Sequence, residues 1–339
     1  MTSRQQRTPT VSCVLPAFNE AGNLPNVVPD ILKALQALFS AVELIIIDDG
    51  SRDDTLKVAR RLSEIHPEVV VLELSRNFGK ECALTAGLQA TRGDVVVLMD
   101  ADGQHPVSLL PEMLAQWQKG MDVVYAVRRS RLDQSPLQRH LTGLFYELVN
   151  FGNRVKIPAH AGDFRLMDRA VVSALNALPE RNRFMKGLYA WVGFPSIAID
   201  YEPLLRQAGK SNFGLMGSVK LALTGFTAFS IAPLRLLTLL GLTIASLSVA
   251  YGVWITIDYF IWGIDVPGYA TVMVSMMFLS GVQMLGIGVV AEYVGRIYEE
   301  AKQRPIFVLR QRDGVGLPVP AVQPADVPVD KPFSDAPLL

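Results

Sequence analysis

Two aspartates separated by one residue, Asp100 and Asp102, are the pair in this chain best suited to chemistry. They follow the apolar run Val95–Met99, and the small Ala101 stands between them. Carboxylates at this spacing can face one hard cation, and bound Mg²⁺ or Mn²⁺ keeps positions open for phosphate and water. An isolated pair of this kind is also typical of a solvated turn, so its surroundings decide its meaning.

Further polar residues stand close to the pair or after earlier apolar runs. Gln104 and His105 follow at once and could add a metal ligand or orient one, whereas the alternative for His105 is a loop histidine with no metal role. Glu20 follows the first apolar run and Asp48-Asp49 the second. Asp48 and Asp49 suit a turn with a helix cap, or an acceptor for hydrogen bonds from a base or a ribose.

The elements that must position these residues are apolar runs alternating with segments of helical spacing. The predicted strands are Val11–Leu15, Glu43–Ile47, Val69–Leu74, Val95–Met99 and Asp122–Val127. Helices are expected between them, because apolar residues there recur at intervals of three and four. This alternation predicts an α/β fold with a mostly parallel sheet covered on both faces. Ligands bind at the carboxyl ends of such strands, so the acidic residues should converge on one crevice.

Basic residues gather after the fifth strand and could contact phosphate. They are Arg128, Arg129, Arg131, Arg139, Arg165, Arg181, Arg183, Lys186, Arg206 and Lys210. Arginine suits bidentate contact with phosphate, although several of these side chains are expected to be simply solvated.

Composition narrows the class of protein. The 339 residues suggest two structural parts, and the formal net charge of zero gives no case for nucleic-acid binding. Cys13 and Cys82 are too few for a zinc site and suggest free thiols in a reducing compartment. Residues 1–10 are polar, so no cleaved signal peptide is expected and residues 1–212 should form a cytoplasmic domain.

Two uncharged segments near the C-terminus predict a transmembrane hairpin. Leu236–Ile257 and Val266–Ala291 are each long enough to cross a hydrocarbon core of about 30 Å. A hairpin buried in a soluble core is the alternative. The hairpin region is residues 234–298. The two spans are flanked by Lys220, Arg235, Arg296, Lys302 and Arg304, whereas the connection between them has no Lys or Arg, which places both termini in the cytoplasm.

The segments on either side of the hairpin have different expected roles. Residues 213–233 carry apolar side chains on one face, which favours an interfacial amphipathic helix over an ordinary domain helix. Residues 299–339 read as a cytoplasmic tail, disordered after about residue 311 because of their composition. Gly281, Gly286 and Gly288 could let hairpins associate into a homo-oligomer.

Four motifs in order resemble glycosyltransferase family 2. They are Pro16-Ala17-Phe18-Asn19-Glu20, Asp48-Asp49-Gly50-Ser51, Ser75-Arg76-Asn77-Phe78-Gly79-Lys80 and Asp100-Ala101-Asp102-Gly103-Gln104-His105-Pro106. The resemblance covers roughly residues 10–310 and is strongest to the polyprenyl-phosphate branch. That branch includes dolichol-phosphate mannose synthase and bacterial undecaprenyl-phosphate glycosyltransferases. It implies a GT-A (Rossmann-like) fold, inverting transfer, a nucleotide-sugar substrate and a divalent metal, Mg²⁺ or Mn²⁺.

The resemblance also implies roles for individual residues. The nucleotide would be lined by Pro16, Phe18, Glu20, Ile47 and Asp49, with Asp100 and Ala101 completing its site. The metal would be held by Asp100, Asp102 and Gln104. Phe18 stands where many relatives have Tyr, and Gly103 where they often have a larger apolar residue.

On the acceptor side, the resemblance places Arg128 and Arg206 near the phosphates. Lys210 would add charge from a closing loop, although many relatives have a lysine where this chain has Asn212. Asp163 is implied as the catalytic base. A phosphate monoester is already ionised near neutral pH, so Asp163 could instead position the sugar or Arg165.

The predicted function is transfer of a hexose from a nucleotide sugar, with UDP-glucose favoured, to polyprenyl phosphate in a bacterial inner membrane. GDP-mannose is the main alternative. A polysaccharide synthase is disfavoured because two spans make a poor polymer channel. A dehydrogenase would need a Gly-x-Gly-x-x-Gly after the first strand, which the chain lacks. A non-catalytic membrane scaffold would not need the acidic residues.

Overall fold

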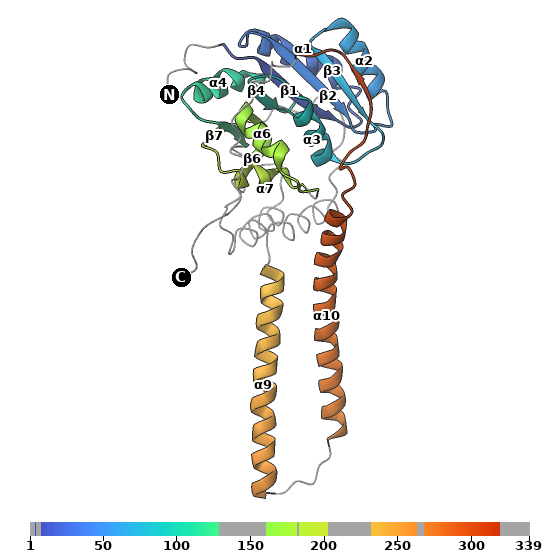
Figure 1. Cartoon of the computed structure of the whole chain (residues 1–339), viewed down its shortest axis with the longest axis vertical. Helices are drawn as coiled ribbons and strands as arrows, with labels where there is room; N and C mark the ends of the chain where they lie inside the picture. The colour runs from blue at the N-terminus through green and yellow to red at the C-terminus, as the bar shows by residue number, and fades with distance from the viewer. Residues whose placement is uncertain are drawn as a thin grey trace, which may run out of the picture.

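A computed structural model describes residues 4, 8–128, 161–181, 183–202, 232–262 and 268–318 of the chain. In Figure 1 an α/β domain stands at one end, and two long helices run side by side away from it. The domain contains the candidate site, and the helices correspond to the predicted hairpin.

The domain is built on one sheet with strand order β7-β5-β6-β4-β1-β2-β3-β8. The strands are β1 (Val11–Ala17), β2 (Val42–Asp48), β3 (Val69–Leu74), β4 (Val95–Leu98), β5 (Val123–Arg128), β6 (Ala161–Asp168), β7 (Ser196–Tyr201) and β8 (Leu309–Asp313). The β1–β2, β2–β3, β1–β4 and β5–β7 pairs are parallel, while β6 and β8 run antiparallel to their neighbours. The mostly parallel α/β sheet predicted from the sequence is confirmed.

Helices cover both faces of the sheet, which explains why its central strands are mostly apolar. They are α1 (Leu24–Gln36), α2 (Thr55–Ile65), α3 (Lys80–Ala90), the short η1 (Val107–Leu109), α4 (Leu110–Gln118), α6 (Arg169–Ala177) and α7 (Met185–Trp191). On β2, Leu44 and Ile46 belong to the core cluster that includes α1, α2 and α4. Ile45 and Ile47 belong to the cluster that includes α3, α6 and α7. Successive side chains of a strand point to opposite faces, so a strand covered on both sides favours apolar residues on both of its faces.

The strand directions bring the ends of β1 to β5 and β7, and the starts of β6 and β8, to one edge of the sheet. Strands β1 to β5 end there, because β6 is antiparallel to both β4 and β5. For the same reason β6 begins at this edge, which brings Asp163 beside the residues that follow the other strands. The order also reverses around β1, and an edge at such a switch point is where α/β proteins bind ligands.

The expectation that the chain is disordered after about residue 311 is wrong for residues 311–318. Strand β8 pairs with β3, and Leu317 is buried with its backbone nitrogen 3.0 Å from a carboxylate oxygen of Glu43. Asp313 lies 2.9 Å from Nε of Arg60. This charged segment is ordered because distant residues satisfy its backbone and its charges. Residues 319–339 lie outside the described part of the chain.

A truncation series should separate the docked segment from the remainder of the tail. We expect a chain ending at Pro318 to have the same midpoint of thermal unfolding as the full-length chain. A chain ending at Val308 should lose at least about 2 kcal/mol of unfolding free energy, because it leaves the β3 edge unpaired and the Leu317 site empty. Thermal unfolding of both purified proteins in detergent measures the difference, and equal midpoints would contradict this assignment.

The two long helices are α9 (Ala232–Trp262) and α10 (Tyr269–Ala301). Helix α9 extends beyond the predicted span Leu236–Ile257 at both ends, whereas α10 begins three residues after Val266 and continues ten residues past Ala291. Ser275–Ala301 is, by length and composition, one helical segment among the described residues that can cross a membrane. Trp254 and Phe260 expose 67% and 81% of their surface, as expected for side chains that face lipid rather than a protein core. At Gly286 an added Cβ would lie 3.4 Å from the Leu237 side chain, so Gly286 serves contact within the hairpin. The predicted interfacial helix lies, up to residue 231, outside the described residues.

Candidate active site

A lysine between two aspartates forms the centre of the acidic edge. Lys80, the first residue of α3, places its Nζ 2.6 Å from an oxygen of Asp100 and 2.6 Å from an oxygen of Asp163. Asp100 follows β4, and Asp163 lies at the beginning of β6. Three elements that are distant in the sequence therefore bring charged groups into direct contact.

The three charges stabilise one another. Burial alone would lower the pKa of Lys80, but Asp100 and Asp163 outweigh it and raise the pKa above its ordinary value. Burial would likewise raise the pKa of Asp163, yet Lys80 and then Lys186 hold it below the ordinary value. Asp163 is consequently ionised throughout the physiological pH range.

The loop carrying Asp100 and Asp102 is held in place by His105. The backbone N–H of Asp100 donates to Nδ1 of His105 over 3.0 Å, and the imidazole stacks on Phe164 with ring centroids 4.9 Å apart. Because Nδ1 accepts a hydrogen bond, the neutral ring carries its proton on Nε2. Burial lowers the pKa of His105, which agrees with this neutral form. His105 therefore positions the acidic loop.

Arg128, the last residue of β5, reaches the same loop. Its Nη2 donates to the Gln104 side-chain oxygen over 2.6 Å, and its Nε lies 3.4 Å from the Tyr201 hydroxyl. The backbone N–H of Gln104 donates in turn to Asp102 over 3.1 Å. Arg128, Gln104 and Asp102 are thus joined, as expected for residues that act at one site.

The donor set limits how a metal ion could bind. Within the described ranges, no three His, Cys, Asp or Glu side chains lie close enough together to hold a metal ion. The carboxylates of Asp100 and Asp102 still supply the oxygen ligands that Mg²⁺ and Mn²⁺ prefer. A two-carboxylate site fits an ion whose remaining ligands are phosphate oxygens and water, as is usual for Mg²⁺.

Asp49 connects the second and third motif loops. Its two carboxylate oxygens accept hydrogen bonds from the backbone N–H groups of Phe78 (2.7 Å) and Gly79 (2.9 Å). Gly50 has a φ of +64°, and a Cβ there would lie 2.5 Å from the backbone of Arg76 and Asn77. Only glycine allows these loops to approach so closely. Asp49 therefore has a positioning role that sequence reasoning did not reveal.

The first motif loop is tied to the loop that precedes α2. The Glu20 backbone N–H donates to the Thr55 hydroxyl over 2.8 Å. Asn19 adopts a left-handed φ of 59°, and its side-chain oxygen accepts from the Arg52 backbone N–H over 2.8 Å. Glu20 is thereby fixed at the same edge as Asp49.

The remaining predicted residues divide into three groups. Pro16 and Phe18 are partly exposed at this edge. Ile47 and Ala101 are buried in the two core clusters, so their side chains pack inside the domain. Arg206 and Lys210 lie outside the described residues.

Lys80 and Glu81 were not among the predicted site residues, although both stand in or beside the third motif. The Gly79-Lys80 pair lacks the spacing of a phosphate-binding P-loop, so the pair alone does not mark a site. The signal that could have identified Lys80 is its place where the segment after β3 leads into α3, since the strand-end rule applies there as well.

Glu81 carries a testable electrostatic cost. Its carboxylate accepts a hydrogen bond from the Met185 backbone N–H over 2.9 Å. Burial, followed by repulsion from Asp163, raises the pKa of Glu81 from 4.5 to about 7. The folded state therefore keeps a proton that the unfolded chain releases, and stability falls as the pH rises from about 4.5 to about 7.

We therefore expect Glu81→Gln, which retains the acceptor, to be more stable than the native protein at pH 8 by up to about 3 kcal/mol. The difference should disappear near pH 4, where the carboxyl group is neutral in both states. Thermal unfolding at the two pH values tests this, with exposed Glu64→Gln on α2 as the control. A Glu81→Gln effect that is the same at both pH values would contradict the assignment.

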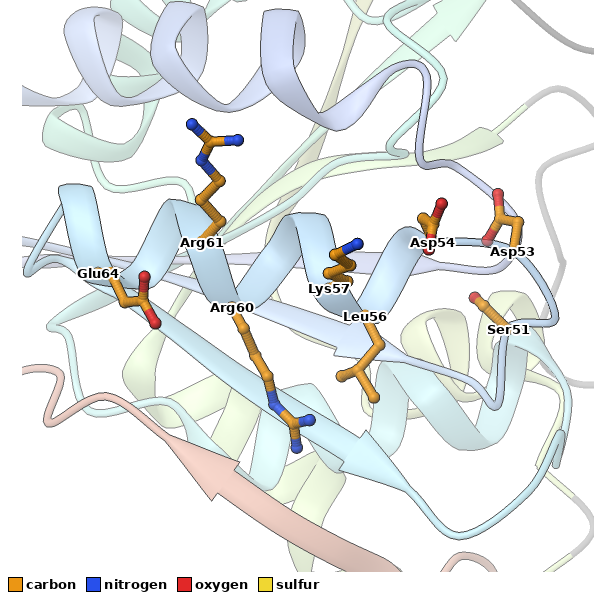
Figure 2. A pocket seen from close by; sticks show the side chains of 8 residues that line it. All are labelled: Ser51, Asp53, Asp54, Leu56, Lys57, Arg60, Arg61 and Glu64. Atoms are coloured by element: carbon orange, nitrogen blue, oxygen red, sulfur yellow. The ribbon is translucent and has the colours of Figure 1, made fainter.

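A separate hollow lies on the surface of α2. Figure 2 shows its lining, which is Ser51, Asp53, Asp54, Leu56, Lys57, Arg60, Arg61 and Glu64. Arg60 points toward β8, where it contacts Glu73 and Asp313. The lining of this hollow includes none of Lys80, Asp100 and Asp163, the charged residues at the acidic edge.

Comparisons with known proteins agree with these observations. The sequence pattern of glycosyl transferase family 2 matches residues 12–175, and that of the GtrB C-terminal hairpin matches residues 232–297. The chain is 43% identical over 302 residues to a bactoprenol glucosyl transferase of Shigella phage SfX, covering 89% of this chain and 99% of the relative. An uncharacterized glycosyltransferase of Synechocystis is 42% identical over 301 residues, 88% of this chain and 94% of the relative.

One further relative and one solved structure are also similar to this chain. A prophage bactoprenol glucosyl transferase homolog of Escherichia coli is 41% identical over 301 residues, 89% of this chain and 98% of the relative. Glucosyl-3-phosphoglycerate synthase from Mycobacterium tuberculosis, solved with Mn²⁺, uridine-diphosphate-glucose and phosphoglyceric acid, is 22% identical. It matches with a TM-score of 0.42 over 65% of this chain and 78% of the other.

The identity to the bacterial and phage glycosyltransferases extends over both the acidic edge and the hairpin. It exceeds 40% and covers nearly nine tenths of the chain. The chain belongs to glycosyl transferase family 2 and is a glycosyltransferase with a C-terminal hairpin of the GtrB type.

Proposed function

We propose that the chain transfers glucose from UDP-glucose to undecaprenyl phosphate, the phosphate of bactoprenol, with inversion at the sugar carbon. The observation that carries the proposal is the identity of 41% to 43% with bactoprenol glucosyl transferases along 97% to 99% of their length. This identity includes the hairpin, which a transferase acting on a soluble acceptor would not need.

The transfer is a single displacement. An oxygen of the lipid phosphate forms a bond to C1 of the sugar, and the bond from C1 to the diphosphate breaks. The diphosphate leaves as UDP, so the product is a sugar linked to the lipid through one phosphate. Negative charge accumulates on the departing diphosphate, and groups that stabilise this charge lower the barrier.

The acidic edge has the groups that this displacement needs. Asp100 and Asp102 would hold Mg²⁺ or Mn²⁺, which when bound neutralises charge on the diphosphate. Arg128, already hydrogen-bonded to Gln104, would add a fixed positive charge on the same side. Gln104 would support this arrangement, either as a further metal ligand or through Arg128. Arg206 and Lys210 are proposed to close over the phosphates from the following loop.

The nucleotide would bind across the ends of β1 and β2. Pro16 lies near the end of β1, Phe18 and Glu20 follow that strand, and Asp49 follows β2. Ile47 and Ala101 support this surface from below, since their side chains are buried. Asp163 would face the acceptor, either taking a proton or fixing the sugar.

The hairpin would anchor the enzyme in a bacterial inner membrane with the domain and both termini in the cytoplasm. Arg296, Lys302 and Arg304 stand at the end of α10 that adjoins the domain. Asp258 lies near the opposite end of α9. This asymmetry of basic residues agrees with the positive-inside rule. The hairpin would also hold the acidic edge near the membrane surface, at the level where the phosphate of the lipid lies.

A screen of labelled nucleotide sugars tests the proposal. Purified full-length chain in detergent is incubated with undecaprenyl phosphate and UDP-glucose, UDP-galactose or GDP-mannose, with and without EDTA. We expect labelled lipid from UDP-glucose, loss of the product with EDTA and recovery with Mg²⁺ or Mn²⁺. Labelled lipid from GDP-mannose alone would favour the mannosyltransferase alternative, and transfer that survives complete metal removal would reject the metal assignment.

A further inference from the structure

Lys80 occupies the position in which a cation would be expected. Its Nζ contacts Asp100 and Asp163 at 2.6 Å each, so the lysine already neutralises the carboxylate to which a metal ion would bind. An ammonium group and a divalent cation cannot both lie against one face of a carboxylate without strong repulsion.

The backbone at Lys80 is fixed, whereas its side chain is long. The carboxylate of Asp49 accepts hydrogen bonds from the backbone N–H groups of Phe78 and Gly79, the two residues directly before Lys80. Gly79 has a φ of +97°, and α3 starts immediately afterwards. The backbone of Lys80 is therefore held in place, whereas its four-carbon side chain can change conformation. The side chain is 35% exposed.

The two aspartates differ in what could replace the lysine. Asp163 is the more enclosed, with 17% of its side chain exposed against 29% for Asp100. Asp100 also stands two residues from Asp102, so it has a second carboxylate with which to share an incoming cation. The ammonium can consequently leave Asp100 and remain paired with Asp163 without leaving either carboxylate uncompensated.

We propose that Lys80 is an internal counter-ion that competes with a divalent cation for Asp100 and then remains on Asp163. In the substrate-free protein it joins Asp100 to Asp163 and keeps metal affinity low. When a metal ion arrives with the nucleotide diphosphate, Lys80 withdraws from Asp100 and holds Asp163 ionised and oriented beside the reacting carbon. Lys80 is therefore a positioning residue, and this role rests on the proposed function of Asp100 as a metal ligand.

Mn²⁺ binding to the full-length protein without nucleotide tests this competition directly. The free Mn²⁺ signal in electron paramagnetic resonance gives the affinity for native protein and for Lys80→Met, Lys80→Gln and Lys80→Arg. We expect both neutral variants to bind Mn²⁺ about tenfold more tightly or better, because a repelling charge is gone. Lys80→Arg keeps the charge and should bind as the native protein does, as should Lys33→Met, which removes an exposed lysine on α1.

Lys80→Gln retains hydrogen-bonding groups for both carboxylates, so it reports on the charge if Lys80→Met does not fold. Unchanged or weaker Mn²⁺ affinity in the folded neutral variants would overturn the proposal. Sugar transfer by the native protein is measured separately. If the native enzyme is active but the variants keep the native Mn²⁺ affinity, only the role of Lys80 is rejected. If the native protein is inactive with every nucleotide sugar, the proposed function itself is rejected.

Discussion

Replacement of Asp163 by Asn should lower turnover by about a hundredfold or more while leaving the affinity for the nucleotide sugar unchanged. Asp163 lies beside Lys80 and begins the strand that reaches the acidic edge, so the variant keeps the shape of the site but loses its charge. Lys80 and Lys186 hold the pKa of Asp163 below its ordinary value against the effect of burial, which keeps the native group ionised.

Steady-state kinetics with varied UDP-glucose and varied lipid phosphate separate the two effects. The maximal rate should fall, whereas binding of UDP measured by calorimetry should stay within about twofold. Asp200→Asn, on exposed β7, is the matched control and should behave as the native enzyme does. Near-normal turnover in Asp163→Asn would reject a central role for this carboxylate.

Replacement of Asp102 by Asn should have an effect at least as large, but of a different kind. We expect transfer to fall by about a thousandfold, because the metal ion loses one of two protein carboxylates and the diphosphate loses much of its stabilisation. Asp102 is a cleaner test than Asp100, whose replacement would also break the contact with Lys80.

Asp102→Asn should in addition raise the metal concentration needed for half-maximal transfer, because it removes one of the two proposed carboxylate ligands. Asp54→Asn is a suitable control, since this exposed aspartate precedes α2 without making a side-chain cap. If Asp102→Asn retained native turnover at the native metal requirement, the pair would not be the metal site.

Much of the fold was predictable because burial on both faces leaves a clear pattern. Strands β1 to β4 are mostly apolar runs, and such runs are hard to mistake when helices separate them. Strand β8 was missed because its sequence, Leu-Arg-Gln-Arg-Asp, is charged and exposed. Edge strands often carry such residues, and this one is held by pairing with β3 and by Arg60, both distant in the sequence.

The site was predictable as far as strand ends could show it. Glu20, Asp49 and Asp100 all follow strands, so the rule placed them at one edge. Contacts made by backbone groups could not be foreseen, which is why the roles of His105 and Asp49 in holding loops emerged only from the structure. The Lys80 contact with Asp163 depends on the antiparallel direction of β6, which no local pattern reveals.

We propose that the residues of the acidic edge transfer glucose to a lipid phosphate in one displacement. The structure of the product tests this most directly. Purified chain is incubated with UDP-glucose and undecaprenyl phosphate, and the product is identified by mass spectrometry and NMR. We expect one glucose joined through a single phosphate to the lipid, in the β configuration. An α-linked product, or free glucose with no lipid product, would contradict it.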